Sequence, residues 1–495
     1  MSISLVPARM VWFCPNCSLE WSYPVKYCTN CRKETGKKDS SRYVVVGFTQ
    51  ISIPSPKNET VPYYVVLLEG DSGGRILKKT FKEPRLGDEF REVLSGGRTL
   101  VSVSRVKYDI SGSVAKVLNL LGDVKINETQ KVLIKPNLSF PANASSGVVT
   151  NPLVVEGVIE YLLSNGARRE DILVGDSCAI GFDMNSILRK SGLGEVCERM
   201  GVEFIDLEEC GTVLREIEIS GEKFRIEFAD EVFKRDLIVN LPVVKTHFQA
   251  GVSLALKNMK GCAKSQSKKY MHRFGLQKAI AYMNLLLPKY VTVADGTVGL
   301  EGFGPSVLGR PADLGLIFAG KDPVALDLTV CRLLGLESTE YMRLASRIGV
   351  GNGDLDSVSV VGEEYQAVTR RLERPAQEFS PTERIRVIDG NGCSGCSNNL
   401  WVALSRLPKD TGSLEAEVVF GSYFGPDRLD SLKLKFAVGD CAIVRMREIG
   451  LEGQGISGCP PETEAILRRL SEWYFHRRGH VAGTWSTNSL LRHPL

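Results

Sequence analysis

The chain has no apolar run near the roughly 18 residues needed to cross a bilayer. Its first residues have no apolar stretch followed by a small-residue cleavage site, so we expect no secretory signal. The formal net charge is only +4, from 62 basic and 58 acidic residues in 495, which gives no electrostatic reason to bind nucleic acid. These absences favour a cytoplasmic protein that binds neither membranes nor nucleic acid.

Several common enzyme motifs are also missing. No Gly-x4-Gly-Lys-Ser/Thr loop occurs, and the glycine-rich segment 299–309 does not fit Gly-x-Gly-x2-Gly after a strand. No Gly-x-Ser-x-Gly elbow is present either. Histidine is scarce, with five in the chain, so a histidine inside a polar motif stands out.

The chain is too long for one hydrophobic core, and its pattern changes along its length. Residues 43 to about 107 predict about five short strands, which fit a small β-barrel such as an OB-fold. From about 110 to 370, strands alternate with helices, which predicts an α/β domain with a largely parallel sheet. We therefore predict a multidomain fold with a zinc ribbon (1–40), an OB-fold barrel (41–108), an α/β core domain (109–370), a linker (371–384), a small cysteine-rich α/β domain (385–480) and a tail (481–495).

Thirteen cysteines without a secretory signal argue for a reducing compartment and for metal ligation rather than disulfides. Cys14, Cys17, Cys28 and Cys31 form two Cys-x2-Cys pairs that are ten residues apart. Each pair can present two thiolates to one ion, and a module this small needs the metal to fold. We predict structural zinc, with rubredoxin-type iron as the alternative.

A ribbon followed by a β-barrel resembles the family of rubredoxin-like zinc-ribbon plus OB-fold proteins. The run WFCPNCSLEWSYPVKYC and the strand GFTQISIP carry this resemblance, which covers about residues 11–107. It implies a module that accompanies thiolase-like and acyl-CoA-handling enzymes. Two interpretations stay open: a docking surface for a partner protein, or direct binding of an acyl-CoA or similar ligand.

Polar motifs follow five predicted strands of the α/β region, and ligands of open parallel sheets bind beyond the carboxyl ends of the strands. Taken singly, Ser177 or Asp322 is as readily explained as a helix N-cap. Together the motifs predict one crevice. They are Lys135-Pro136-Asn137, Gly175-Asp176-Ser177, Lys245-Thr246-His247, Asp295-Gly296 with Glu301-Gly302, and Lys321-Asp322.

This mixture of side chains suits a substrate that carries a carboxylate or a phosphate. Lysines bind the anion, and a histidine or a carboxylate moves a proton. The segment GVSLALKNMKG (251–261) places two lysines and a run of backbone amides together. We predict catalytic roles for His247, Lys245, Asp176, Asp295 and Glu301, and substrate binding by Lys135, Asn137, Ser177, Lys257, Asn258 and Lys260.

These motifs resemble the uncharacterised family called domain of unknown function 362, over about residues 130–365. The resemblance rests on seven blocks in order: VLIKPNLS, NPLVVEGVIEYLLSNGA, ILVGDS, IVNLPVVKTH, SLALKNMKG, DGTVGLEGFGP and GKDPVALD. It implies an α/β domain that often accompanies iron–sulfur segments, and it implies no particular reaction.

A second cysteine set contains Cys393, Cys396, Cys441 and Cys459, separated by two, 44 and 17 residues. One pair and two single cysteines differ from the two pairs of a short-knuckle zinc site. The set resembles the proximal-cluster domain of hydrogenase small subunits over about 385–470, most sharply at Gly-Cys-Pro-Pro (458–461). The resemblance implies a 4Fe–4S cluster on the four thiolates. Zinc and an unmetallated dithiol are the alternatives.

The sequence therefore favours an iron–sulfur and zinc-containing enzyme that acts on a carboxylate, phosphate or acyl-CoA substrate by redox or Lewis-acid chemistry. One alternative is a scaffold or electron-transfer subunit of a thiolase-like or redox complex. A second is a nucleic-acid-binding ribbon/OB protein, which the near-neutral charge disfavours. The expected partners are a small anionic substrate and a thiolase-like or redox protein.

Overall fold

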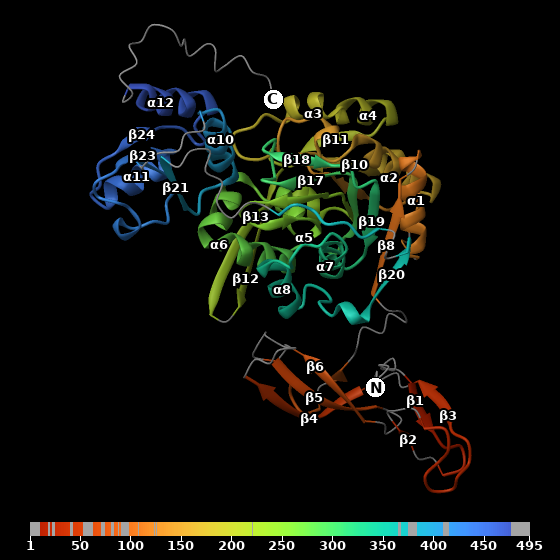
Figure 1. Cartoon of the computed structure of the whole chain (residues 1–495). Coiled ribbons are helices and arrows are strands. Elements are labelled where there is room, and N and C mark those ends of the chain that lie inside the picture. Colours follow the sequence, from red (N-terminus) through yellow and green to blue (C-terminus); the bar gives the residue numbers. More distant parts are fainter. Residues whose placement is uncertain are drawn as a thin grey trace. The chain divides into compact units, whose positions relative to one another are not determined.

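The computed structural model of the chain describes residues 10–17, 20–21, 25–39, 43–52, 63–70, 75–80, 84–87, 89–90, 99–106, 108–122, 124, 126–219, 221–364, 368–374, 384–408 and 415–476. Its contacts define two compact units (Figure 1). The first contains residues 1–98 and 347–349, and the second contains residues 99–346 and 350–495. The predicted tail (481–495) and most of the predicted linker (371–384) lie outside the described residues.

The first unit contains two small antiparallel sheets. One has the order β2-β1-β3 and the other the order β6-β5-β4-β7. Val45, Val66 and Leu68 form a compact apolar cluster in the larger sheet. The OB-fold stays a prediction. The strands are β1 (Met10–Phe13), β2 (Glu20–Trp21), β3 (Gly36–Asp39), β4 (Tyr43–Ile51), β5 (Tyr63–Gly70), β6 (Arg75–Thr80) and β7 (Glu89–Phe90).

The second unit is built on a large mixed sheet with the strand order β11-β10-β9-β14-β17-β19-β8-β20. The neighbours from β11 to β17 run parallel, whereas β19 runs antiparallel to both β17 and β8. The further strands β15 and β18 pair with β17, and β16 pairs with β15. The strands are β8 (Thr99–Arg105), β9 (Val132–Lys135), β10 (Ile172–Asp176), β11 (Glu203–Asp206), β14 (Leu237–Asn240), β15 (Val243–His247), β16 (Gly251–Ser253), β17 (Val291–Gly302), β18 (Gly309–Ala312), β19 (Leu316–Gly320) and β20 (Val358–Gly362).

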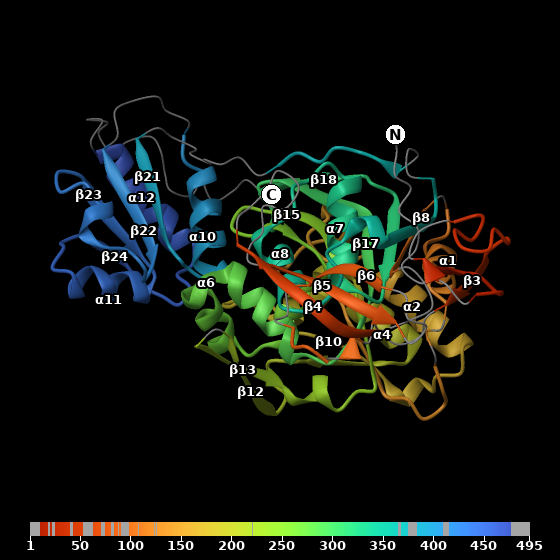
Figure 2. The same ribbon diagram turned by 90° about the horizontal axis from the view of Figure 1, so that it is seen from below.

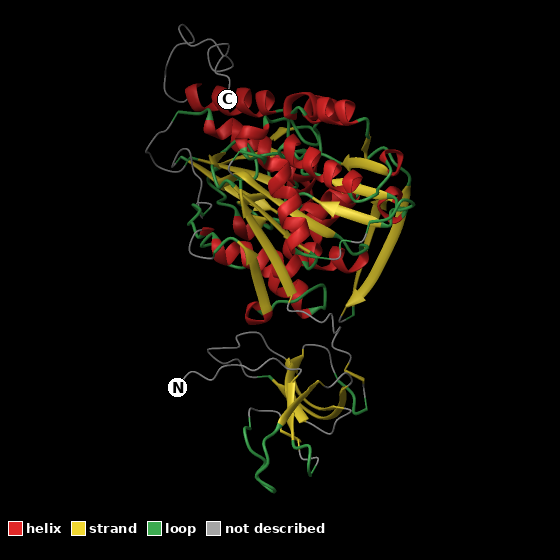
Figure 3. Ribbon diagram, turned by 90° about the vertical axis from the view of Figure 1, so that its right-hand side faces the viewer, coloured by secondary structure: helices red, strands yellow, loops and turns green. Residues whose placement is uncertain are grey.

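Strands β9, β10 and β19 are buried at every position. β9 and β10 are parallel strands covered on both faces, so their sequences read as nearly continuous apolar runs, and the antiparallel β19 is buried in the same way inside the sheet. Figure 3 shows red helices packed around these yellow strands. The mostly parallel sheet and its helices confirm the predicted multidomain α/β class.

Polar caps fix the starts of several helices in this unit. Asn151 accepts a hydrogen bond from the Leu153 N–H at the start of α2, and Asp322 caps α7 in the same way. Among the described residues, no helix combines the length and hydropathy needed to cross a membrane. The helices are α1 (Ile110–Leu120), α2 (Pro152–Ser164), α3 (Met184–Ser191), α4 (Leu193–Met200), α5 (Ala255–Asn258), α6 (Ser265–Leu286), α7 (Pro323–Leu333) and α8 (Glu340–Arg347).

The domain boundary near residue 100 differs from the predicted one. We expected the barrel to extend to residue 108, but β8 pairs with β19 and β20 in the large sheet. Val101 and Val103 are fully buried there. The first unit therefore ends at Arg98.

The cysteine-rich region is a four-stranded parallel sheet with the order β21-β22-β23-β24 (Figure 2). Alternate residues of β22 and β23 pack into two separate apolar clusters, one with α10 and α12 and the other with α11. Helices therefore cover both faces of the sheet. The elements are β21 (Ile385–Gly390), β22 (Ala416–Gly421), β23 (Leu434–Val438), β24 (Gln454–Ile456), α10 (Ser394–Ser405), α11 (Asp440–Glu448) and α12 (Thr463–His476).

Candidate functional site

An ion pair joins the carboxyl ends of the neighbouring strands β9 and β10. Lys135 Nζ lies 2.7 Å from Asp176 Oδ1, and the two side chains are 0% and 3% exposed. The backbone N–H groups of Leu138 and Ser177 also donate to the Asp176 carboxylate, at 2.8 and 2.9 Å. A buried charge needs such partners, because its transfer from water is otherwise costly.

A chain of amide groups connects this strand edge to α5. Lys245 Nζ donates to Asn137 Oδ1 at 2.6 Å, and Asn137 Nδ2 donates to Asn258 Oδ1 at 2.8 Å. Asn258 Nδ2 in turn donates to Asn240 Oδ1 at 2.8 Å. The pKa of Lys245 is lowered to about 7, chiefly by burial; Asp176 opposes this shift, and Lys135 makes a smaller contribution to it.

Helix α5 is held in place by a buried carboxylate of α7. Asp327, which is 0% exposed, accepts the N–H groups of Ala255 and Leu256 at 2.8 and 3.1 Å. Burial raises the pKa of Asp327 to about 8. These bonds fix the one-turn helix that carries Lys257.

Two further lysines follow from α5 and the short turn after it. Burial lowers the pKa of Lys257 to about 7, and Lys245 adds to this effect. Lys260 Nζ lies 2.7 Å from Nε2 of His272 on α6. Burial also lowers the pKa of Lys260, and the charges of Lys257 and Lys268 add to it.

His247, at the end of β15, is a neutral hydrogen-bond donor. Its Nδ1 accepts the backbone N–H groups of Gln249 and Ala250 at 3.1 and 3.2 Å. The proton of the neutral ring is therefore on Nε2. Burial, followed by the charges of Lys257 and Lys245, keeps the pKa of His247 well below its usual value. If His247 has the predicted role in moving a proton, its Nε2–H is the group that can donate.

Ser177 and Lys268 close the same edge from the side of α6. Lys268 Nζ donates to Ser177 Oγ at 2.6 Å, and Ser177 Oγ donates to the Gly261 carbonyl at 2.5 Å. A Cβ atom on Gly261 would lie 2.0 Å from Asp176 Oδ1 and 2.7 Å from Lys135 Nζ. Glycine is therefore needed where the backbone passes the buried ion pair.

These side chains line one cavity of about 80 Å³. Five lysines face it, and Asp176 is its one carboxylate among the residues that the structure describes. The predicted residues in its lining are Lys135, Asn137, Asp176, Ser177, Lys245, His247, Lys257, Asn258 and Lys260.

Sequence reasoning missed Lys268 and Ser394, which also line this cavity. Lys268 lies on α6, and only the packing of that helix brings its amine to Ser177. Ser394 lies between Cys393 and Cys396 and comes from the cysteine-rich domain. The spacing of Cys393 and Cys396 predicted a metal-binding loop, but it did not predict that this loop lines the cavity.

Asp295 and Glu301 lie outside the lining of this cavity. Asp295 accepts a hydrogen bond from the Asn151 N–H at 2.7 Å, and this bond fixes the residue that caps the start of α2. It also accepts hydrogen bonds from the N–H and the hydroxyl of Thr297. Glu301 accepts the Glu373 N–H at 3.0 Å and pairs with Arg310. Both residues lie within β17 rather than beyond its end, so the strand does not direct them to the cavity.

The first cysteine set is arranged to bind one metal ion. The sulfur of Cys14 lies 3.3 Å from that of Cys31, and Cys17 lies 3.3 Å from Cys28. All four sulfurs lie within 4.8 Å of one another. A tetrahedral zinc with bonds of about 2.3 Å needs sulfurs roughly 3.8 Å apart, so the two pairs at 3.3 Å would have to separate by about 0.5 Å to hold it. Backbone N–H groups of residues 30 and 31 also point at Cys28 Sγ.

The second cysteine set lies at one edge of the small parallel sheet. Cys393 and Cys396 follow β21, Cys441 follows β23, and Cys459 follows β24. The last two loops are tied together, because Asp440 N donates to Gly458 O at 3.1 Å and Gly458 N donates to Asp440 Oδ1 at 2.8 Å. The carboxyl edge of a parallel sheet thus gathers all four thiols.

The thiols of this set interact but are spread more widely than those of the first set. The pKa of Cys396 is raised by its hydrogen bond with Cys393, by burial, and by the charges of Cys393, Cys441 and Cys459. Among the described residues, the first set is the one group of three or more potential ligands within 4.8 Å.

The cysteine-rich domain touches the lysine cavity directly. Ser394 Oγ lies 3.4 Å from His272 Nε2, the same nitrogen that Lys260 Nζ contacts at 2.7 Å. A Cβ atom on Gly395 would lie 2.5 Å from the Ile180 carbonyl and 2.9 Å from Pro460 Cγ. The turn that carries Cys393 and Cys396 therefore forms part of the cavity wall.

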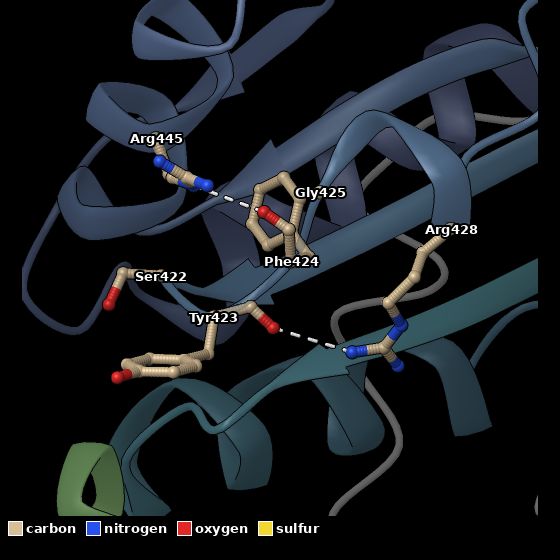
Figure 4. Close-up of a pocket in the computed structure, with 6 residues that line it drawn as sticks. All are labelled: Ser422, Tyr423, Phe424, Gly425, Arg428 and Arg445. Carbon is tan, nitrogen blue, oxygen red and sulfur yellow. Dashed lines mark hydrogen bonds between the residues drawn. The ribbon is translucent and has the colours of Figure 1, made fainter.

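A second hollow, of about 400 Å³, follows β22 in the cysteine-rich domain. Figure 4 shows Arg445 and Arg428 on opposite sides of Phe424. Arg445 Nε donates to the Phe424 carbonyl at 3.0 Å, and Arg428 donates to the Tyr423 carbonyl at 3.3 Å. Both guanidinium groups thus bind backbone carbonyls of the loop. The lysine cavity is smaller, but more titratable side chains line it.

The central α/β domain, with its ligand cavity at the strand ends, matches a known family. Residues 132–332, which make up less than half of the chain, match the family described as domain of unknown function (DUF362). This confirms the resemblance drawn from the seven sequence blocks.

The chain is similar to a curated protein and to solved structures. It is 25% identical over 227 residues to the thylakoid-associated protein sll1697 of Synechocystis sp., which covers 45% of this chain and 68% of that protein. A Thermotoga maritima protein of known structure is 12% identical, with a TM-score of 0.34, over 71% of this chain and 91% of that one. The lactate racemase apoprotein of Thermoanaerobacterium thermosaccharolyticum is 13% identical, with a TM-score of 0.32, over 75% of this chain and 74% of that one.

Proposed function

We propose that this chain is an iron–sulfur and zinc-containing enzyme that acts on a small anionic molecule in the lysine-lined cavity. The observation that carries the proposal is the charge of the lining, which holds five lysines and one carboxylate. Clusters of buried titratable groups with perturbed pKa values are typical of functional sites.

The charge of the cavity favours an anionic ligand. Asp176 pairs with Lys135, which leaves Lys245, Lys257, Lys260 and Lys268 without a carboxylate in the lining. Buried ammonium groups are costly unless a negative charge accompanies them. An entering carboxylate or phosphate supplies that charge and makes charge-assisted hydrogen bonds.

The size of the cavity limits which part of a substrate can enter it. The cavity of about 80 Å³ is several times the roughly 10–15 Å³ that one ordered water needs, so it has room for a small molecule or group. A carboxylate, a phosphate or a short oxo acid fits this space. The nucleotide part of an acyl-CoA is too large for it and would lie outside.

The residues of the cavity have separate roles in this proposal. Lys257, Lys260 and Lys268 bind the anion, and the Nε2–H group of His247 donates to an oxygen on which negative charge develops. Lys245, with a pKa of about 7, is suited to give or take a proton near neutral pH.

The cysteine sets hold the two metal groups in this proposal. Cys14, Cys17, Cys28 and Cys31 bind zinc, which stabilises the N-terminal module. Cys393, Cys396, Cys441 and Cys459 hold a 4Fe–4S cluster, which supplies one-electron transfer or Lewis acidity when bound. The position of Ser394 in the cavity wall supports a role for that cluster in the chemistry of the bound anion. The N-terminal module then serves as a docking surface or as the acyl-CoA site.

Anaerobic purification of the full chain tests the metal assignment. We expect about four iron and four acid-labile sulfide per chain together with one zinc. Cys459→Ser should lose the iron and keep the zinc, and Cys31→Ser should do the reverse. Cys331→Ser, which changes a buried cysteine outside both sets, is the matched control. Zinc without iron or visible iron–sulfur absorption would rule out the cluster.

Mass spectrometry of small molecules released from the same preparation tests the ligand class. A released carboxylate or phosphate compound in the wild-type chain, absent from Lys257→Gln/Lys260→Gln, is the expected result. A neutral or cationic ligand that both proteins release equally would overturn the anion assignment.

A further inference from the structure

One lysine of the cavity differs from the other four in its partners. Four amines are held by protein groups: Lys135 by Asp176, Lys245 by Asn137, Lys260 by His272 and Lys268 by Ser177. Among the described residues, Lys257 has neither a hydrogen bond nor an ion pair. Its side chain lines the cavity and is partly exposed there. Its amine is therefore free to meet whatever enters.

We propose that Lys257 is a nucleophile that forms a Schiff base with a small oxo acid, whose carboxylate the neighbouring lysines bind. This inference rests on the proposed function, because it assigns a substrate class and a covalent step to the same cavity. An oxo acid of about six heavy atoms is small enough for a cavity of about 80 Å³.

The surroundings of Lys257 favour the neutral amine that such a step needs. Burial and the ammonium of Lys245 bring its pKa to about 7, so a large fraction of the amine carries a lone pair near neutral pH. Desolvation beside a second cation is an established way to activate a lysine for attack on a carbonyl. Asp327 strengthens this by fixing the backbone of α5 just before Lys257.

The step balances without a further reactant. The Lys257 Nζ lone pair forms a bond to the carbonyl carbon, and the carbonyl π pair moves to its oxygen. The Nε2–H of His247 donates to that oxygen as the negative charge develops. The two amine protons leave with the oxygen as water, which gives the imine, and protonation gives the iminium.

Reductive trapping tests the inference on the full chain. The anaerobically purified protein is incubated with pyruvate and sodium cyanoborohydride, and peptides are mapped by mass spectrometry. We expect a reduced pyruvate adduct on Lys257 at more than ten times the level of any other lysine. Propionate, which has the carboxylate but no oxo group, should leave no adduct.

Two arginine variants separate nucleophilicity from charge. Lys257→Arg keeps a cation, so it should bind sulfate within about threefold of wild type while losing the adduct. Lys289→Arg changes an exposed lysine of the same domain and should keep the adduct. Circular dichroism and thermal unfolding show whether each variant is folded. Lys257→Gln is a second variant that also removes the amine and should lose the adduct.

The outcomes distinguish this inference from the proposed function. If sulfate binds but no lysine is trapped, or if Lys257→Arg is labelled as well as wild type, Lys257 is only a cation for the anion and the inference is overturned. If neither sulfate nor pyruvate binds the wild-type chain, the proposed function fails together with it.

Discussion

The substitution Asp176→Asn should destabilise the central domain by about 3–5 kcal/mol, the usual cost of removing one partner of a buried ion pair. The pair is nearly inaccessible, with side-chain exposures of 0% for Lys135 and 3% for Asp176. The N–H groups of Leu138 and Ser177 donate to different oxygens, Oδ2 and Oδ1, and asparagine keeps only one of them, so one of these bonds is lost as well. Asparagine also places its own N–H₂ group or a neutral oxygen against the buried ammonium.

The effect should reach beyond Lys135, because Asp176 also favours the charged forms of two other lysines. Its charge raises the pKa of both Lys245 and Lys268 against the effect of burial. Removing the charge therefore lowers both pKa values further. The expected cost lies in the upper half of the range for a single pair.

Hydrogen exchange of the full chain at increasing urea concentrations measures this change locally. Peptides that cover β9 and β10 report the free energy of opening of the strand pair. The double variant Lys135→Met/Asp176→Asn should regain at least about 1 kcal/mol over the sum of the single effects, because it removes the unpaired charge. Asp356→Asn, at an exposed position, should stay within about 0.5 kcal/mol of wild type. A loss below about 1 kcal/mol for Asp176→Asn, or strict additivity in the double variant, would refute the buried-pair reasoning.

Three further predictions concern the cavity and its supports. Sulfate affinity should fall as the pH rises from 6 to 8, since Lys245 and Lys257 have pKa values lowered to about 7 and lose their charge over this range. Titration calorimetry should show a weaker pH dependence for Lys257→Gln than for wild type. An equal slope in both proteins would contradict the role of Lys257 in binding the anion. Asp327→Ala should cost about 2–5 kcal/mol in urea unfolding, because it leaves the N–H groups of Ala255 and Leu256 without an acceptor, whereas Asp327→Asn keeps an acceptor and should cost less. Gly395→Ala should weaken iron retention during gel filtration, since a Cβ atom there meets the Ile180 carbonyl at 2.5 Å, and unchanged retention would show that this contact is dispensable.

The sequence predicted the cavity well where a polar motif directly follows a short buried strand. Lys135 and Asp176 end β9 and β10, and parallel neighbours bring such ends together, so the strand-end pattern predicted that both lie at one crevice, but it did not predict that they pair with each other. The same logic located Lys245 and His247 at the end of β15. Here local pattern and tertiary position agree.

Prediction failed where position depends on long-range packing. The strand around Asp295 runs on for twelve residues in β17, so Asp295 and Glu301 lie along it instead of past its end. The pairing of β8 with β19 joins residues more than 200 apart, for which the chain has no local signal. Lys268 reaches the cavity only through the packing of α6. In each case the deciding contact is distant in sequence.

The central claim, a lysine cavity that binds a small anion, is tested most directly by titration calorimetry of the anaerobically purified full chain with sulfate at pH 6.5 and low salt. The account predicts one site per chain. It also predicts that Lys257→Gln/Lys260→Gln weakens binding at least tenfold, since each charge-assisted bond contributes about 1.5–3 kcal/mol, while Lys289→Gln binds like wild type. Equal affinity in the double variant and the wild-type chain would contradict the claim.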